Sequence, residues 1–213
     1  MPDVPMFISQ SGDPADIKLA ERIAEKWQFA MVTAPPSGLA LMIQGGQLSL
    51  KDFADPKQLP VSVDFLSGSS TYRQQRGGGK SEPVVKAIGL KGHENYHVID
   101  ATPGLGRDAF VLASVGCHVT MIERSPMVAA LLEDGIRRLQ EAGDTVAERL
   151  TLQHGNSTVV MHHWDGDNVE NIFASLAEDG SFPAITFATI AVIGLGYVGL
   201  PLATAFSSVG FRV

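Results

Sequence analysis

This 213-residue chain has almost no cysteine and carries no net positive charge. Cys117 is the only cysteine, so no intrachain disulfide can form, and a reducing compartment is the expected environment. The 16 lysines and arginines are outnumbered by 23 aspartates and glutamates, which gives a net charge of −7. This balance excludes a generally basic coat for nucleic acid, so any such contact must come from a local basic patch.

The chain also lacks a long apolar run ahead of its C-terminal end. Its start, MPDVPMFISQSGD, has neither the basic residues nor the apolar centre of a secretory signal peptide. We therefore expect a cytoplasmic protein that does not enter a membrane. With 45% hydrophobic residues, the chain is long enough to bury one domain, or one domain and a small lobe.

Residues 97–124 predict one complete βαβ unit. A short apolar run closed by Asp100 predicts a strand, Gly104 and Gly106 predict a tight turn, and a helical pattern follows them. A second apolar run ends at Glu123. Glycines let the backbone approach a ligand closely, and an acid at this position can accept hydrogen bonds from a ribose diol. The unit therefore predicts a site for a nucleoside cofactor.

Asp108, at the start of the helix, bears on which nucleoside cofactor fits. A dinucleotide-binding loop reads GxGxxG and places a pyrophosphate on the helix N-terminus, whereas this loop reads DATPGLGRD. A carboxylate there would repel a pyrophosphate and would attract a cationic amino-acid end or a sulfonium. S-adenosylmethionine carries both. A glycine turn in a purely structural unit is the alternative.

Three motifs are far more specific than the glycine count: RQQRGGG, DATPGLGRDAF and ERSPMVAALL. With them, the chain over about residues 1–180 resembles the ribosomal RNA small subunit methyltransferase J family. The resemblance implies a class I, S-adenosylmethionine-dependent enzyme that methylates the exocyclic amine (N2) of a guanine in small-subunit rRNA. Its partner would be that rRNA or the 30S subunit.

The resemblance also implies which residues hold the cofactor, and the βαβ unit adds Asp100 and its two loop glycines. The full set of expected cofactor-binding residues is Asp100, Gly104, Gly106, Arg107, Asp108, Glu123, Arg124, Asn156 and Ser157. By spacing alone, Asn156 and Ser157 are ordinary turn residues. They follow an apolar run at 150–153, however, and ligands in doubly wound sheets bind at the carboxyl ends of the strands.

The densest basic stretch, YRQQRGGGK, covers residues 72–80. Arg73, Arg76 and Lys80 can contact phosphates, and Tyr72 can stack on a base exposed from single-stranded RNA. A solvated linker is the alternative. The family resemblance favours RNA binding.

The residues ahead of this stretch predict a small β-rich α+β lobe over residues 1–75. Asp13 and Pro14 predict a helix start, and two strand-like runs around Gly45 and Gly46 predict a hairpin. A third strand is expected at residues 61–66.

Residues 76–180 predict the cofactor-binding domain, so the fold class is α/β, with a Rossmann-like class I methyltransferase sheet that is truncated at its C-terminal side. In its second crossover helix, Glu133 with Arg137 and Asp134 with Arg138 are spaced to form pairs on the solvent-exposed side.

His162, His163, Asp165 and Asp167 are residue types that bind metals, but their spacing matches no zinc or calcium template. We expect no metal site. Asp167 is instead predicted to cap a helix that Gly180 ends.

Beyond about residue 180 the chain departs from the methyltransferase pattern. The family would next show an apolar strand ending in Asp-Pro-Met, followed by an aromatic residue and Pro, which hold the guanine amine; this motif is absent. Residues 189–213 instead resemble the N-terminus of an NAD-dependent nucleotide-sugar dehydrogenase, because Gly194, Gly196 and Gly199 spell GxGxxG after an apolar run.

Residues 181–213 are too few to bury a core of their own. A strand containing Ile190 should therefore join the existing sheet, in the vacant fourth place beside the strand that ends at Asp100, or remain disordered. We expect the chain to bind S-adenosylmethionine and to transfer the methyl group slowly or not at all. A fragment of an NAD-dependent dehydrogenase and a non-catalytic nucleoside- or RNA-binding remnant are the alternatives.

Overall fold

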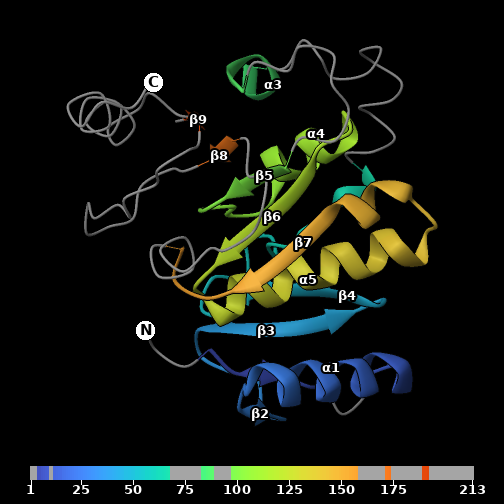
Figure 1. The fold of residues 1–213 in the computed structure, drawn as a ribbon. Helices are drawn as coiled ribbons and strands as arrows, with labels where there is room; N and C mark the ends of the chain where they lie inside the picture. The colour runs from blue at the N-terminus through green and yellow to red at the C-terminus, as the bar shows by residue number, and fades with distance from the viewer. Residues whose placement is uncertain are drawn as a thin grey trace.

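Two β-sheets with helix α5 between them form the framework of the molecule (Figure 1). The computed structural model describes residues 4–9, 12–67, 83–88, 97–157, 171–173 and 189–191. One cluster of buried apolar side chains joins the two sheets; its members include Met6 and Leu41 of the first sheet, Met121 of the second and Leu139 of α5. Among these residues, no helix has the length and apolar character needed to cross a bilayer.

The first sheet comes from the N-terminal part of the chain. Its elements are β1 (Met6–Phe7), α1 (Pro14–Trp27), β2 (Met31–Val32), β3 (Leu39–Gln44) and β4 (Gln47–Asp52). The strand order is β2-β1-β3-β4, and β3 and β4 form the predicted antiparallel hairpin. Gly45 and Gly46 make its turn with positive φ, and their N–H groups donate to the Asp16 carboxylate at 2.8 and 2.7 Å. Asp16 therefore ties the hairpin turn to α1.

The predicted third strand at residues 61–66 is wrong. Val61 forms only an isolated bridge with Leu50, and residues 65–67 are helical. Asp64 explains the difference, because its Oδ1 accepts hydrogen bonds from the N–H groups of Leu66 and Ser67. A short acidic side chain that satisfies the next backbone amides favours a helical turn over an extended strand.

The second sheet carries the predicted βαβ unit. Its elements and their neighbours are α3 (Pro83–Ala87), β5 (His97–Asp100), α4 (Arg107–Ser114), β6 (His118–Glu123), α5 (Pro126–Glu141), the 3₁₀ helix η1 (Thr145–Arg149), β7 (Leu150–His154), β8 (Asn171–Phe173) and β9 (Thr189–Ala191). The order is β7-β6-β5-β8-β9, and every neighbouring pair is parallel. All five carboxyl ends therefore lie at one edge of the sheet.

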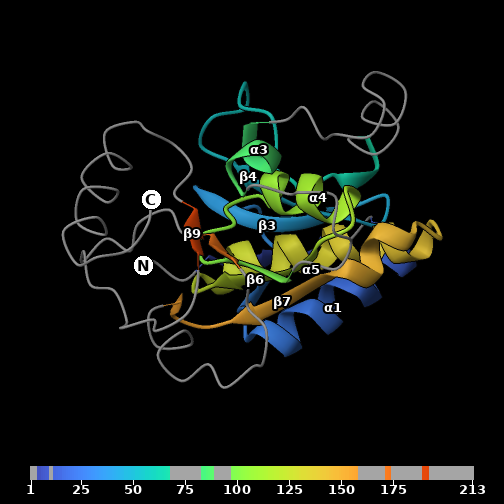
Figure 2. The same ribbon diagram turned by 45° about the horizontal axis from the view of Figure 1, so that its top comes forward.

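Two expectations for the C-terminal part change. The helix expected after Asp167 is wrong at residues 171–173, which form β8 in the fourth place of the sheet, with Ile99 opposite Ile172. A short apolar run fits a buried strand as well as a helix. The strand containing Ile190, β9, does join the sheet as expected, but in the fifth place, beside β8 (Figure 2).

The pair expected between Asp134 and Arg138 exists, but it is not exposed to solvent. Asp134 is 2% exposed and accepts hydrogen bonds from the Leu48 N–H at 3.0 Å, from Arg137 Nη2 at 2.7 Å and from Arg138 Nε at 3.0 Å. The first sheet covers this side of α5. Asp134 is thus the centre of a buried ionic cluster that ties α5 to the first sheet.

Candidate functional site

The glycine loop after β5 is held close to the protein core. Gly104 has φ 52° and Gly106 has φ 73°, a region that other residues rarely adopt. A Cβ atom on Gly106 would lie 2.8 Å from Leu132 of α5 and 2.9 Å from Phe65. Gly106 is therefore required both by its backbone conformation and by the space around it, and it fixes the start of α4 at the carboxyl edge of the sheet.

Three carboxylates converge beside this loop: Asp100 at the end of β5, Asp108 in the first turn of α4 and Glu123 at the end of β6. Asp100 is 2% exposed and accepts a hydrogen bond from the Thr102 N–H at 3.2 Å. Burial raises the pKa of Asp100 to about 7; the Thr102 hydrogen bond opposes this rise, and the charges of Asp108 and Glu123 add to it. The site is therefore electrostatically prepared for a cation.

The end of β6 is fixed by hydrogen bonds to its neighbours. Glu123 Oε1 accepts from the Ser125 N–H at 2.7 Å, and the Glu123 carbonyl accepts from the Gly155 N–H at 2.9 Å. Among the described residues, no group donates a hydrogen bond to Glu123 Oε2. This half-buried carboxylate is thus oriented through one of its two oxygens.

The remaining expected cofactor residues lie at the same edge. Arg107 begins α4 and Arg124 follows β6, and both are exposed. Asn156 is exposed and Ser157 is half-buried just after β7. The structure therefore brings the expected cofactor-binding residues to one edge of three adjacent parallel strands.

Other expected residues lie outside the described part of the chain. These are the RNA-contact residues Tyr72, Arg73, Arg76 and Lys80, the cluster His162, His163, Asp165 and Asp167, and the glycines Gly194, Gly196 and Gly199. Within the described residues, no group of three or more His, Cys, Asp or Glu side chains is placed to hold a metal ion.

The C-terminal end of α1 contacts α5 and the end of β7, which no sequence pattern indicated. Glu133 does not pair with Arg137; its Oε2 accepts from Trp27 Nε1 at 2.9 Å, and its Oε1 pairs with Lys26. The Trp27 ring also contacts the His154 ring edge to face, with centroids 5.2 Å apart. The partners are more than 100 residues apart in the chain, so no local pattern could have revealed them.

The sheet order, the tight glycine loop and the acid at the end of the second strand define the class of Rossmann-like methyltransferases. Residues 22–175 match the family model SAM_MT, SAM-dependent methyltransferase. A solved SAM-dependent methyltransferase from Neisseria gonorrhoeae is similar at a TM-score of 0.62 and 33% identity, over 80% of this chain and 68% of that one.

Curated relatives make the assignment more specific. The ribosomal RNA small subunit methyltransferase J of Alteromonas mediterranea is 57% identical over 173 residues, which are 80% of this chain and 67% of the relative. The protein of that name from Pseudoalteromonas atlantica is 45% identical over 74% of this chain and 62% of its own length. The chain belongs to the ribosomal RNA small subunit methyltransferase J family, and it spans about two thirds or less of the length of these relatives.

Proposed function

We propose that the chain binds S-adenosylmethionine at the carboxyl edge of β5, β6 and β7 and acts on guanine N2 of small-subunit rRNA. The observation that carries the cofactor assignment is the convergence of Asp100, Asp108 and Glu123 beside the glycine loop. Three carboxylates disfavour a pyrophosphate and favour a ligand with an ammonium and a sulfonium group.

The proposed roles of the residues follow from their places along this edge. Glu123 accepts hydrogen bonds from the ribose hydroxyls through Oε2, while Asp100 and Asp108 face the cationic amino-acid end. The loop glycines, Gly104 and Gly106, allow the backbone to approach the ligand closely. The remaining proposed contacts are Arg107, Arg124, Asn156 and Ser157.

The reaction places few demands on acid–base groups. S-adenosylmethionine, when bound, would supply an electrophilic methyl group on its sulfonium for transfer to the guanine amine; its sulfur would leave as a neutral thioether, and the amine proton would pass to solvent. The contribution of the protein is to position the amine and exclude water around it.

Binding and turnover are separable in this proposal. Tyr72, Arg73, Arg76 and Lys80 are the proposed rRNA contacts, and the 30S subunit in the cytoplasm is the proposed partner. The Asp-Pro-Met motif that would position the amine is absent from the 213 residues, so we propose that the cofactor binds normally and that transfer is slow.

A methyl-transfer assay tests the substrate assignment. Small ribosomal subunits and protein-free small-subunit rRNA are incubated with S-adenosylmethionine labelled in its methyl group, and the modified nucleoside is identified by mass spectrometry. The proposal expects a low level of N2-methylguanosine that disappears in the Glu123→Gln variant. Methylation of a different base would refute the substrate assignment, and rapid turnover would refute the predicted impairment.

A further inference from the structure

A groove of about 530 Å³ lies between α1 and β7, over α5, and we call it the α1–β7 groove. Its apolar lining includes Leu19 and Ile23 of α1 and Leu152 of β7. Arg22 and Lys26 also line it. The volume lies within the range of sites that hold a small ligand or one unit of a polymer.

The charges in the groove leave a positive excess. Its lining contains three cations, Arg22, Lys26 and Arg137, and two carboxylates, Glu133 and Asp134. Both carboxylates are engaged: Glu133 by Lys26 and Trp27, and Asp134 by Arg137 and Arg138.

Arg22 is the cation that remains for a ligand. It is exposed, and within the described part of the chain it forms no ion pair. The chain as a whole has a net charge of −7, so an RNA contact depends on local cations such as this one. The Arg22 guanidinium is complementary to a phosphate, and the sugar and base of the same nucleotide can cover the apolar side chains that line the groove.

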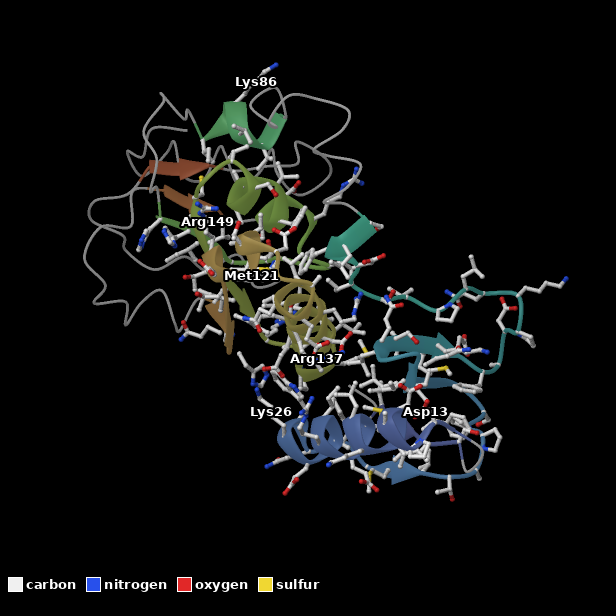
Figure 3. All side chains as sticks on the ribbon, turned by 90° about the vertical axis from the view of Figure 1, so that its right-hand side faces the viewer. Asp13, Lys26, Lys86, Met121, Arg137 and Arg149 are labelled. Atoms are coloured by element: carbon white, nitrogen blue, oxygen red, sulfur yellow. The ribbon has the colours of Figure 1, made fainter. Side chains whose placement is uncertain are left out.

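The C-terminal end of α1 connects the groove with the neighbourhood of the cofactor edge. Lys26, in the last turn of α1, lines the groove, and Figure 3 shows it near Arg137, between α1 and α5. The next residue, Trp27, packs on His154 at the carboxyl end of β7, and His154 Nε2 lies 3.2 Å from the carbonyl oxygen of Arg124. An RNA strand that runs from the groove past Trp27 would therefore reach the carboxyl end of β7, beside the proposed cofactor site.

We propose that the α1–β7 groove is a second docking surface for rRNA, with a phosphate on Arg22 and a sugar or base over Leu19, Ile23 and Leu152. The inference rests on the proposed function, because it assumes that rRNA is the substrate. It assigns part of the RNA contact to α1, far along the chain from the basic stretch at residues 72–80.

The test compares Arg22→Ala with Lys18→Ala. Both substitutions remove one exposed cation from α1, but Lys18 does not line the groove. Binding of a fluorescent, protein-free small-subunit rRNA transcript is measured by anisotropy at several salt concentrations. We expect Arg22→Ala to weaken binding about three- to tenfold and to reduce the salt slope by about one ion, and Lys18→Ala to change affinity less than about twofold.

Three outcomes would contradict the proposal that rRNA binds in the α1–β7 groove. Equal losses in the two variants would indicate general electrostatic attraction, and no loss in Arg22→Ala would remove the contact. A loss seen only with intact subunits would assign the groove to a ribosomal protein instead of rRNA.

Calorimetry with S-adenosylmethionine separates these results from the proposed function. Both variants should bind the cofactor as the wild type does, because neither residue is at the cofactor edge. A wild-type protein that binds neither cofactor nor rRNA would refute the proposed function itself.

Discussion

Replacing Asp100 with Asn should stabilise the unliganded protein at neutral and alkaline pH. The Asp100 carboxyl is 2% exposed, and burial raises its pKa from 3.8 to about 7. Each unit of pKa shift corresponds to about 1.4 kcal/mol, so ionising this group in the folded protein costs on the order of 4 kcal/mol. Asn keeps the shape and can still accept from the Thr102 N–H, but it carries no charge.

The sign of the pH dependence follows from the direction of the shift. Because the pKa of Asp100 is higher in the folded state, the folded protein holds this proton between about pH 4 and pH 7 while the unfolded chain releases it. The contribution of Asp100 to the free energy of unfolding therefore falls as the pH rises through this window. Above about pH 7 the loss is complete.

Urea unfolding of the wild type and Asp100→Asn between pH 4 and pH 8 measures this effect. We expect similar free energies of unfolding at pH 4 and a variant that is more stable by about 2–4 kcal/mol at pH 8, with the same urea dependence. A variant that loses stability relative to the wild type as the pH rises would refute the reasoning. That result would mean that the folded protein stabilises the ionised carboxylate.

Three further predictions concern stability and reactivity. Asp134→Ala leaves two arginines without their buried partner and should lower the free energy of unfolding by about 3–5 kcal/mol in urea titrations; a loss below about 1 kcal/mol would contradict the buried cluster. Gly106→Ala should lower the free energy of unfolding by about 2–4 kcal/mol, because backbone strain and close contacts add. Gly104→Ala, with no atom within 4 Å of its Cβ, should lower it by about 1–2 kcal/mol. Equal losses in the two variants would contradict the close packing at Gly106. Cys117 is 1% exposed and burial raises the pKa of its thiol to about 11, so a thiol reagent at pH 8 should label it only after denaturation, and rapid labelling of the native protein would show that it is accessible.

Local sequence signals predicted the parts of the fold in which neighbouring residues satisfy the backbone. Asp13 caps α1 by accepting from the Ala15 N–H at 2.7 Å, and the predicted Pro14 follows it. Ser125 caps α5 in the same way, with Pro126 next in the chain. The glycine loop and the two strands around it were predicted for the same reason, since a positive φ and a period of apolar residues are both local properties.

The strand expected at residues 61–66 fails for a local reason, the hydrogen bonds that Asp64 accepts, whereas other failures depend on contacts between distant residues. Asp134 lies on a helix position that the periodicity places in solvent, but the first sheet covers it there. Residues 171–173 pair with β5, more than 70 positions earlier in the chain, and that pairing selects a strand. Trp27 and His154 show the same limit at the candidate site, because neither has a local pattern that indicates its partner.

Calorimetric titration of the purified chain with S-adenosylmethionine and with NAD, with Glu123→Gln measured beside the wild type, decides which cofactor the site binds. We expect one S-adenosylmethionine per chain, no binding of NAD, and a tenfold to hundredfold weaker affinity in the variant, since a hydrogen bond to a charged acceptor contributes about 1.5–3 kcal/mol. Binding of NAD in place of S-adenosylmethionine, or an unchanged affinity in Glu123→Gln, would contradict this cofactor assignment.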